Sequence, residues 1–132
     1  MPIRYAVRAD GRFIHATAYD TVTDKDLVEY EIAFASDERI THPADELLEF
    51  KRQSVVEVTR DGILEALERK KGLAREQVDH RCAIVVPYGD SVTWDLAKFY
   101  ESMAMLHSAY GVIVFGDVAI ARLWLGVDGD QP

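Results

Sequence analysis

Histidine is the residue in this sequence best suited to metal binding or to proton transfer near neutral pH. Four occur, at His15, His42, His80 and His107. A helical metal site needs a second ligand three or four residues away, and none of the four has one. A zinc site of paired Cys and His residues is excluded because the chain has one cysteine. We expect no metal centre and no catalytic histidine.

That cysteine, Cys82, is a possible nucleophile by residue type. Reactive thiols lie near cations or helix N-termini, whereas Cys82 falls in the apolar run 81–87, which is typical of a buried strand. Gly111 and Gly116 have the spacing of a P-loop, but Asp117 stands where that motif needs Lys, and no G-x-S-x-G is present. We expect no catalytic residue and no cofactor, hence a protein that is not an enzyme.

Four glutamates recur at the spacing of helix faces that point to water: Glu29, Glu31, Glu65 and Glu68. We interpret them as a solvated surface and not as a catalytic pair of carboxylates. The sequence therefore predicts no acid–base site among them.

Aromatic residues in the segment from residue 91 onward allow two interpretations. Trp94, Phe99 and Tyr100, with Met103, and then Met105 and Tyr110, could line an apolar ligand pocket. Packing against a sheet is the favoured alternative on general grounds. Trp94 is also expected beside Tyr88 and Asp90, at the carboxyl end of a strand, where open α/β sheets tend to bind ligands.

The elements that position these residues follow from turns, caps and apolar spacing. Asp10-Gly11 separates two β-prone runs, as in a hairpin. Thr23 followed by Asp26 resembles a capping box, and Gly126 stops the last helix. The expected strands are 3–9, 13–18, 45–50, 81–87 and 112–115, and the expected helices begin near residues 24, 60, 91 and 118. This order, β-β-α-β-α-β-α-β-α, predicts an α/β fold with a mixed, mostly parallel five-stranded sheet and four helices.

Length and charge limit the class of protein. The chain has 132 residues and 48% hydrophobic residues, which suits a single domain over 1–126 with an acidic, flexible tail over 127–132. A net charge of −8 argues against nucleic acid as a partner. No segment has the layout of a secretory signal or the length of a membrane span, so we expect a cytoplasmic protein without membrane insertion.

One short stretch gives the most specific local match to a known family. Val58-Thr59-Arg60-Asp61-Gly62-Ile63 precedes and opens the second expected helix. With the order of elements over residues 3–126, it resembles the STAS fold of anti-sigma-factor antagonists and sulphate-transporter domains. It is also similar to the bacterial SpoIIAA-like proteins, of STAS/SEC14 type. Antagonists carry Asp-Ser-Ser-Gly-Leu here. Gly62 and Ile63 fit the end of that motif, but Arg60 stands at the phosphorylated serine.

The resemblance implies a non-enzymatic protein-interaction or regulatory domain without the usual phosphoserine switch, because Thr59 and Ser54 are hydroxyls out of register. The partner-binding residues it implies are Thr59, Arg60, Asp61 and Gly62, extended by the neighbouring turn with Tyr88, Asp90 and Ser91. The SEC14-type side of the resemblance implies an alternative, a module that binds a small apolar molecule or a lipid. A homodimer through an exposed sheet edge is also possible.

Overall fold

The computed structural model describes residues 2–41, 43–73, 81–107 and 111–127. The strands in these ranges are β1 (Ile3–Arg8), β2 (Phe13–Ala18), β3 (Thr21–Thr23), β4 (Asp45–Phe50), β5 (Val55–Glu57), β6 (Arg81–Val85) and β7 (Gly111–Phe115). The α-helices are α1 (Asp24–Ser36), α2 (Arg60–Leu73), α3 (Ser91–His107) and α4 (Val118–Leu125). Of the expected tail, residues 128–132 lie outside the described part.

Five strands form the main sheet in the order β1-β2-β4-β6-β7. Strands β1 and β2 are antiparallel, and the other neighbours are parallel. The predicted α/β class, mixed five-stranded sheet and four helices are confirmed for the described residues. The prediction lacked β3 and β5, which form a separate parallel pair. Each has three residues, too few for apolar alternation to reveal a strand.

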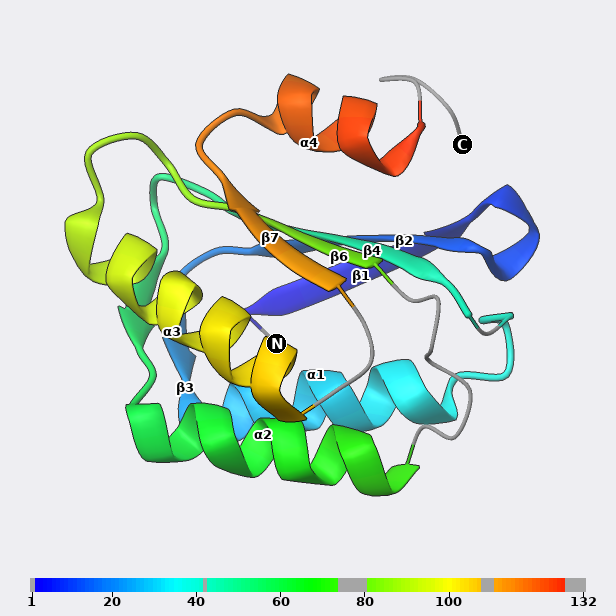
Figure 1. The fold of residues 1–132 in the computed structure, drawn as a ribbon, viewed down its shortest axis with the longest axis horizontal. Coiled ribbons are helices and arrows are strands. Elements are labelled where there is room, and N and C mark those ends of the chain that lie inside the picture. Colours follow the sequence, from blue (N-terminus) through cyan, green and yellow to red (C-terminus); the bar gives the residue numbers. More distant parts are fainter. Residues whose placement is uncertain (1, 42, 74–80, 108–110, 128–132) are drawn as a thin grey trace.

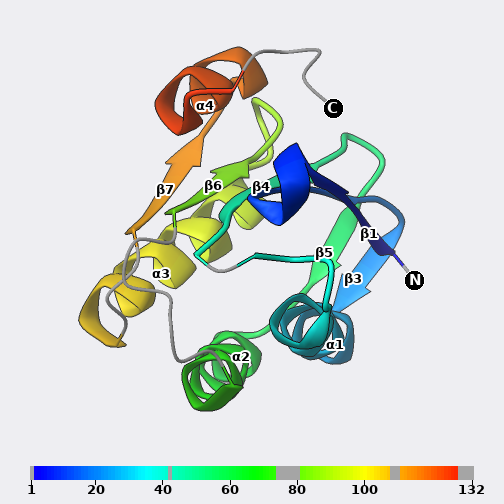
Figure 2. The same cartoon turned by 90° about the vertical axis from the view of Figure 1, so that its right-hand side faces the viewer.

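The helices cover both faces of the sheet unequally. Figure 1 shows α1, α2 and α3 on one face and α4 on the other, and the view in Figure 2 shows the same layers from one end. Strand β6, between β4 and β7, is buried on both sides, since Cys82 and Ile84 pack on the three-helix side while Ala83 and Val85 pack under α4. This confirms what its continuous apolar sequence predicted. Within the described ranges, no helix has the length and apolarity to cross a bilayer.

Hydrogen-bonding caps fix where the helices start. The predicted capping box opens α1, with the Thr23 amide donating to Asp26 Oδ2 over 2.9 Å. Asp90, directly before α3, accepts from the Thr93 amide over 3.1 Å and caps that helix. Helix α4 ends where predicted, at Gly126, whose φ of 74° is left-handed. These caps hold the loops at the carboxyl ends of the strands in fixed positions.

The hairpin turn predicted at Asp10-Gly11 is present, as a 3-10 turn over Ala9–Gly11. Gly11 is buried with φ +90°, and a Cβ built on it would lie 2.3 Å from the Arg39 carbonyl oxygen. Its own carbonyl accepts from the Thr41 amide over 2.8 Å. The glycine therefore allows the hairpin to pack directly on the loop that follows α1.

Candidate ligand-binding site

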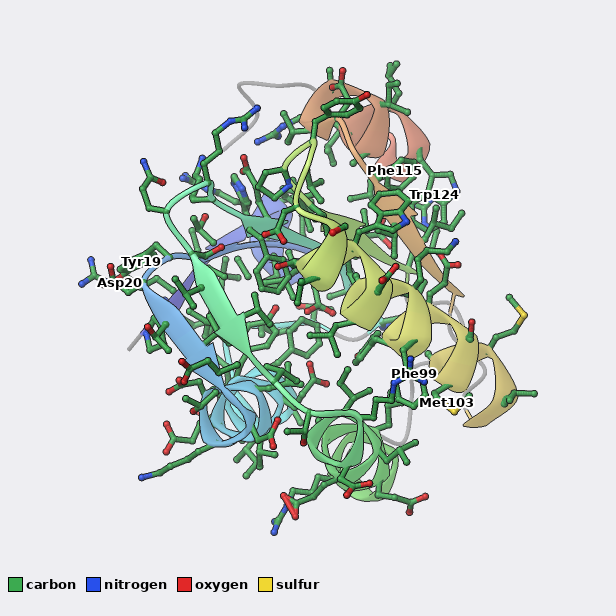
Figure 3. The ribbon with its side chains drawn as sticks, turned by 90° about the vertical axis from the view of Figure 1, so that its left-hand side faces the viewer. Tyr19, Asp20, Phe99, Met103, Phe115 and Trp124 are labelled. Carbon is green, nitrogen blue, oxygen red and sulfur yellow. The ribbon has the colours of Figure 1, made fainter. Side chains whose placement is uncertain are left out.

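A surface groove at the carboxyl ends of the strands gathers three of the seven predicted partner-binding residues. Tyr88, Asp90 and Ser91 lie with Trp94 and Gly116 around a space of about 440 Å3. The groove forms because α3 and α4 follow neighbouring strands but turn to opposite faces of the sheet, at the edge that Figure 3 views. Tyr88 is 88% exposed.

The segment Thr59–Gly62 has a separate set of contacts and is not among the residues lining that groove. The Asp24 carboxylate accepts hydrogen bonds from the Thr59 amide (2.7 Å) and the Thr59 hydroxyl (2.6 Å). The same hydroxyl accepts from the Gly62 amide over 3.0 Å and so caps α2. These bonds tie the start of α2 to the start of α1. A phosphate on Thr59 would stand against the Asp24 carboxylate.

Arg60 and Asp61, the two charged residues between Thr59 and Gly62, differ in their surroundings. Arg60 stacks on α3, with its guanidinium carbon 4.6 Å from the centre of the Phe99 ring. Phe99 lies near Met103 on the side of α3 that faces α2 (Figure 3). Asp61 is exposed in the first turn of α2. The predicted surface therefore consists of two parts, and much of the part at Thr59–Gly62 holds helices together.

A second, partly open pocket, called the internal pocket below, lies between the sheet and the layer of α1, α2 and α3. Its volume is about 50 Å3, enough for a few water-sized groups. Short strands β3 and β5 contribute Val22 and Val56 to its wall. The other lining residues are Leu27, Glu31, Glu46, Leu48, Phe50, Val58, Ile63, Cys82, Ile84, Thr93, Leu96, Ala97 and Tyr100. The wall is mostly apolar, with two carboxyl groups in it.

Those carboxyls belong to Glu31 on α1 and Glu46 on β4, which are 2% and 1% exposed. The Tyr30 hydroxyl donates to Glu46 Oε2 over 2.5 Å. Burial, and then the charges of Glu46 and Glu31, raise the pKa of Tyr30 well above 10, so the phenol remains a donor. Carboxyl groups this deeply buried are costly unless a proton or a cation neutralises them.

The solvated position expected for Glu31 is wrong. In α1 the buried stripe contains Leu27, Tyr30, Glu31 and Phe34, whereas Ile32 is 38% exposed. Glu31 follows Leu27 by four residues and precedes Phe34 by three, so the helix places all three on one face. That spacing was the signal in the sequence, and the charge of the side chain obscured it. Glu46 and Leu48 are two residues apart on β4, so their side chains point to the same face of the sheet, the one that the three helices cover.

The aromatic residues of α3 separate into different environments. Tyr100 lines the internal pocket, Trp94 lines the surface groove, and the Phe99 ring stacks with the Arg60 guanidinium. Met105 is 74% exposed. Tyr110 lies outside the described residues. A pocket beside α3 exists, but one aromatic residue of that predicted set contributes to it.

Elsewhere, the clearest polar cluster lies on the open part of the sheet face that α4 also occupies. His15 Nε2 is 3.2 Å from Glu49 Oε1, and Lys51 Nζ is 3.1 Å from the other carboxylate oxygen. The hydrogen bond from His15, with that from Lys51, lowers the pKa of Glu49 to about 2. His42 and His80 lie outside the described residues. Among the residues that are described, no three His, Cys, Asp or Glu side chains form a group that could hold a metal ion.

Comparison of the chain with protein-family models, with curated proteins and with solved structures finds no match.

Proposed function

We propose that this chain is a non-enzymatic domain that binds a small molecule in the pocket between the sheet and helices α1–α3. The observation that supports this most is the placement of two buried carboxyls, Glu31 and Glu46, in a pocket whose wall is mostly apolar. Such a pocket can hold the apolar part of a ligand against its walls and orient one polar group. The proposal selects the binding alternative that the SEC14-type resemblance implied.

The volume of the pocket favours a small molecule over a lipid. Since one water needs about 10–15 Å3 of such space, the pocket's 50 Å3 corresponds to roughly four non-hydrogen atoms. The best small ligands gain about 1.5 kcal/mol per such atom, which limits Kd to roughly tens of micromolar. We therefore expect a weak, rapidly exchanging ligand.

Ligand-observed NMR tests this function. We expect saturation transfer to a library of alcohols, amides and amines of up to about six non-hydrogen atoms. Ala97 is 7% exposed and lines the pocket, so Ala97→Leu should fill it and remove the signals. Ala119→Leu, on the exposed side of α4, is the control and should keep them. A library without hits, or hits that persist in folded Ala97→Leu, would contradict the function.

A STAS-like protein-interaction domain is the second proposal, and the groove at the carboxyl ends of the strands supports it. Tyr88 and Val92 are 88% and 63% exposed beside that groove, where a docked partner would cover their apolar surface. The order of elements supports the STAS-like part of the proposal.

Site-specific photo-crosslinking in cells tests the interaction. A benzophenone side chain placed at Val92 should give one discrete adduct, identified by mass spectrometry, because a docked partner would cover this residue. The same probe at exposed Glu38, after α1, should not give that adduct. Equal labelling from both positions would argue against a partner at the groove.

A further inference from the structure

We propose that the surface groove at the carboxyl ends of the strands binds an arginine side chain of a partner protein. This inference rests on the second proposal above, the protein-interaction domain, and names the chemistry of the partner. It combines three observations on the groove: its shape, the aromatic rings in its wall and the negative charge around it.

The first step concerns shape. The groove lies between the turn that joins β6 to α3 and the turn that joins β7 to α4 (Figure 1). Its space of about 440 Å3 falls within the range of ligand pockets, about 300–1,000 Å3. Gly89 and Gly116 line it, and a Cβ on either glycine would meet nothing within 4 Å. A long side chain that enters the groove therefore has access to the rings beside these glycines.

The second step concerns those rings. Tyr88 and Trp94 both line the groove, and they are 88% and 36% exposed. A guanidinium is planar and more weakly hydrated than an ammonium, so it stacks on an aromatic face at a lower cost in lost hydration. Arginine, with tryptophan and tyrosine, is also enriched among the residues that contribute most to protein–protein binding. The wall of the groove therefore suits arginine better than lysine.

The third step concerns charge. None of the eight residues that line the groove, all within the described part of the chain, is Lys, Arg or His. Three aspartates lie in or beside it. Asp90 is one of the lining residues, and exposed Asp117 directly follows the lining residue Gly116. Asp95 is exposed on α3 and follows Ser91 of the groove by four residues, so the helix places both on one face.

Two helix N-termini reduce this negative charge without cancelling it. Asp90 caps α3 and Asp117 caps α4, and each N-terminus carries about half a positive charge. Three carboxylates and two such termini leave a net charge of roughly −2 at the groove. The next cation along α3, Lys98, is paired with Glu101 over 2.6 Å. The groove therefore attracts a cation, and the net charge of −8 on the chain adds attraction at longer range.

The experiment compares N-acetylarginine amide with N-acetylcitrulline amide, which has nearly the same shape and no charge. Affinities come from the NMR shift of the Trp94 indole N–H. We expect the arginine compound to bind at least about fivefold more tightly at low salt, since ring stacking and the carboxylates both favour it. This preference should fall in 1 M NaCl, because salt screens the exposed carboxylates.

Two pairs of matched variants locate the binding. Asp95→Asn should lower the preference about twofold, whereas Asp10→Asn, in the hairpin before the amino end of β2, should leave it unchanged. Gly116→Leu should fill the groove and abolish binding of the arginine compound. Gly111→Leu, at the other end of β7, is the control, because a Cβ there also meets nothing within 4 Å.

The outcomes separate this inference from the function on which it rests. Equal binding of the two compounds, or binding of neither, would overturn the arginine. The interaction function would still stand if the probe at Val92 gave its discrete adduct, and without that adduct both would be lost. A preference for arginine that persists in folded Gly116→Leu would also overturn the inference. If that variant does not fold, the comparison of Asp95→Asn with Asp10→Asn still decides whether the arginine lies in the groove.

Discussion

The double variant Tyr30→Phe/Glu46→Leu is expected to be at least as stable as the wild-type protein, whereas Tyr30→Phe alone should lose about 2–3 kcal/mol. Tyr30 is 0% exposed and donates to a carboxyl that is itself 1% exposed. Removing the phenol alone leaves a buried carboxyl without that donor. Removing both groups leaves no buried Glu46 carboxyl that needs a donor. Replacing a buried polar pair by apolar side chains is often neutral or stabilising.

Urea denaturation of the wild type, both single variants and the double variant measures this coupling. Tyr5→Phe is the matched control, since the Tyr5 hydroxyl donates to Asp37 over 2.7 Å at a half-buried position. Water can replace that bond, so the control should lose less than about 1 kcal/mol. Losses in the double variant equal to the sum of the single losses would contradict the argument.

The same variant bears on function. If the carboxyl of Glu46 is retained for a ligand, the double variant should be stable and yet lose the saturation-transfer signals of the small-molecule library. If removing a buried polar group raises stability, the group does not serve stability. Binding sites commonly lower the stability of the fold in this way in exchange for function. Stability and binding measured on one variant therefore test whether the buried pair is structural.

The sequence predicted the main sheet and helices because each boundary has a local signal. Asp10-Gly11, Thr23 with Asp26, and Gly126 are turn and cap residues whose effects depend on neighbours in the chain. The pair β3 and β5 could not be predicted in this way. Each strand has three residues, and the pairing joins segments more than thirty residues apart.

The internal pocket was harder to predict than the fold. Its walls come from seven helices and strands, and its volume depends on how side chains from all of them pack, which no local pattern specifies. Glu31 was misjudged by its type, since a glutamate on a helix is usually solvated. The helical spacing of Glu31 from Leu27 and Phe34 outweighs that expectation once the face is known to be buried.

Gly62→Ala is expected to destabilise the wild-type protein by about 2 kcal/mol and to stabilise an Asp24→Ala background by up to about 1 kcal/mol. A Cβ on Gly62 would lie 2.0 Å from Asp24 Oδ1 and 2.1 Å from Cγ. The carboxylate would have to turn away and give up both hydrogen bonds from Thr59. Without that carboxylate, alanine contributes only its better helix propensity.

A double-mutant cycle by urea denaturation measures this reversal of sign. Gly116→Ala is the control, because a Cβ there meets nothing within 4 Å, and its effect should be the same in both backgrounds. The resemblance to antagonist proteins implied that Gly62 is a partner-binding residue. A sign reversal assigns the glycine instead to the contact between α1 and α2. An equal cost of Gly62→Ala in both backgrounds would show that Asp24 is not the reason for a glycine at this position. It would then favour a role for Gly62 in the interaction surface.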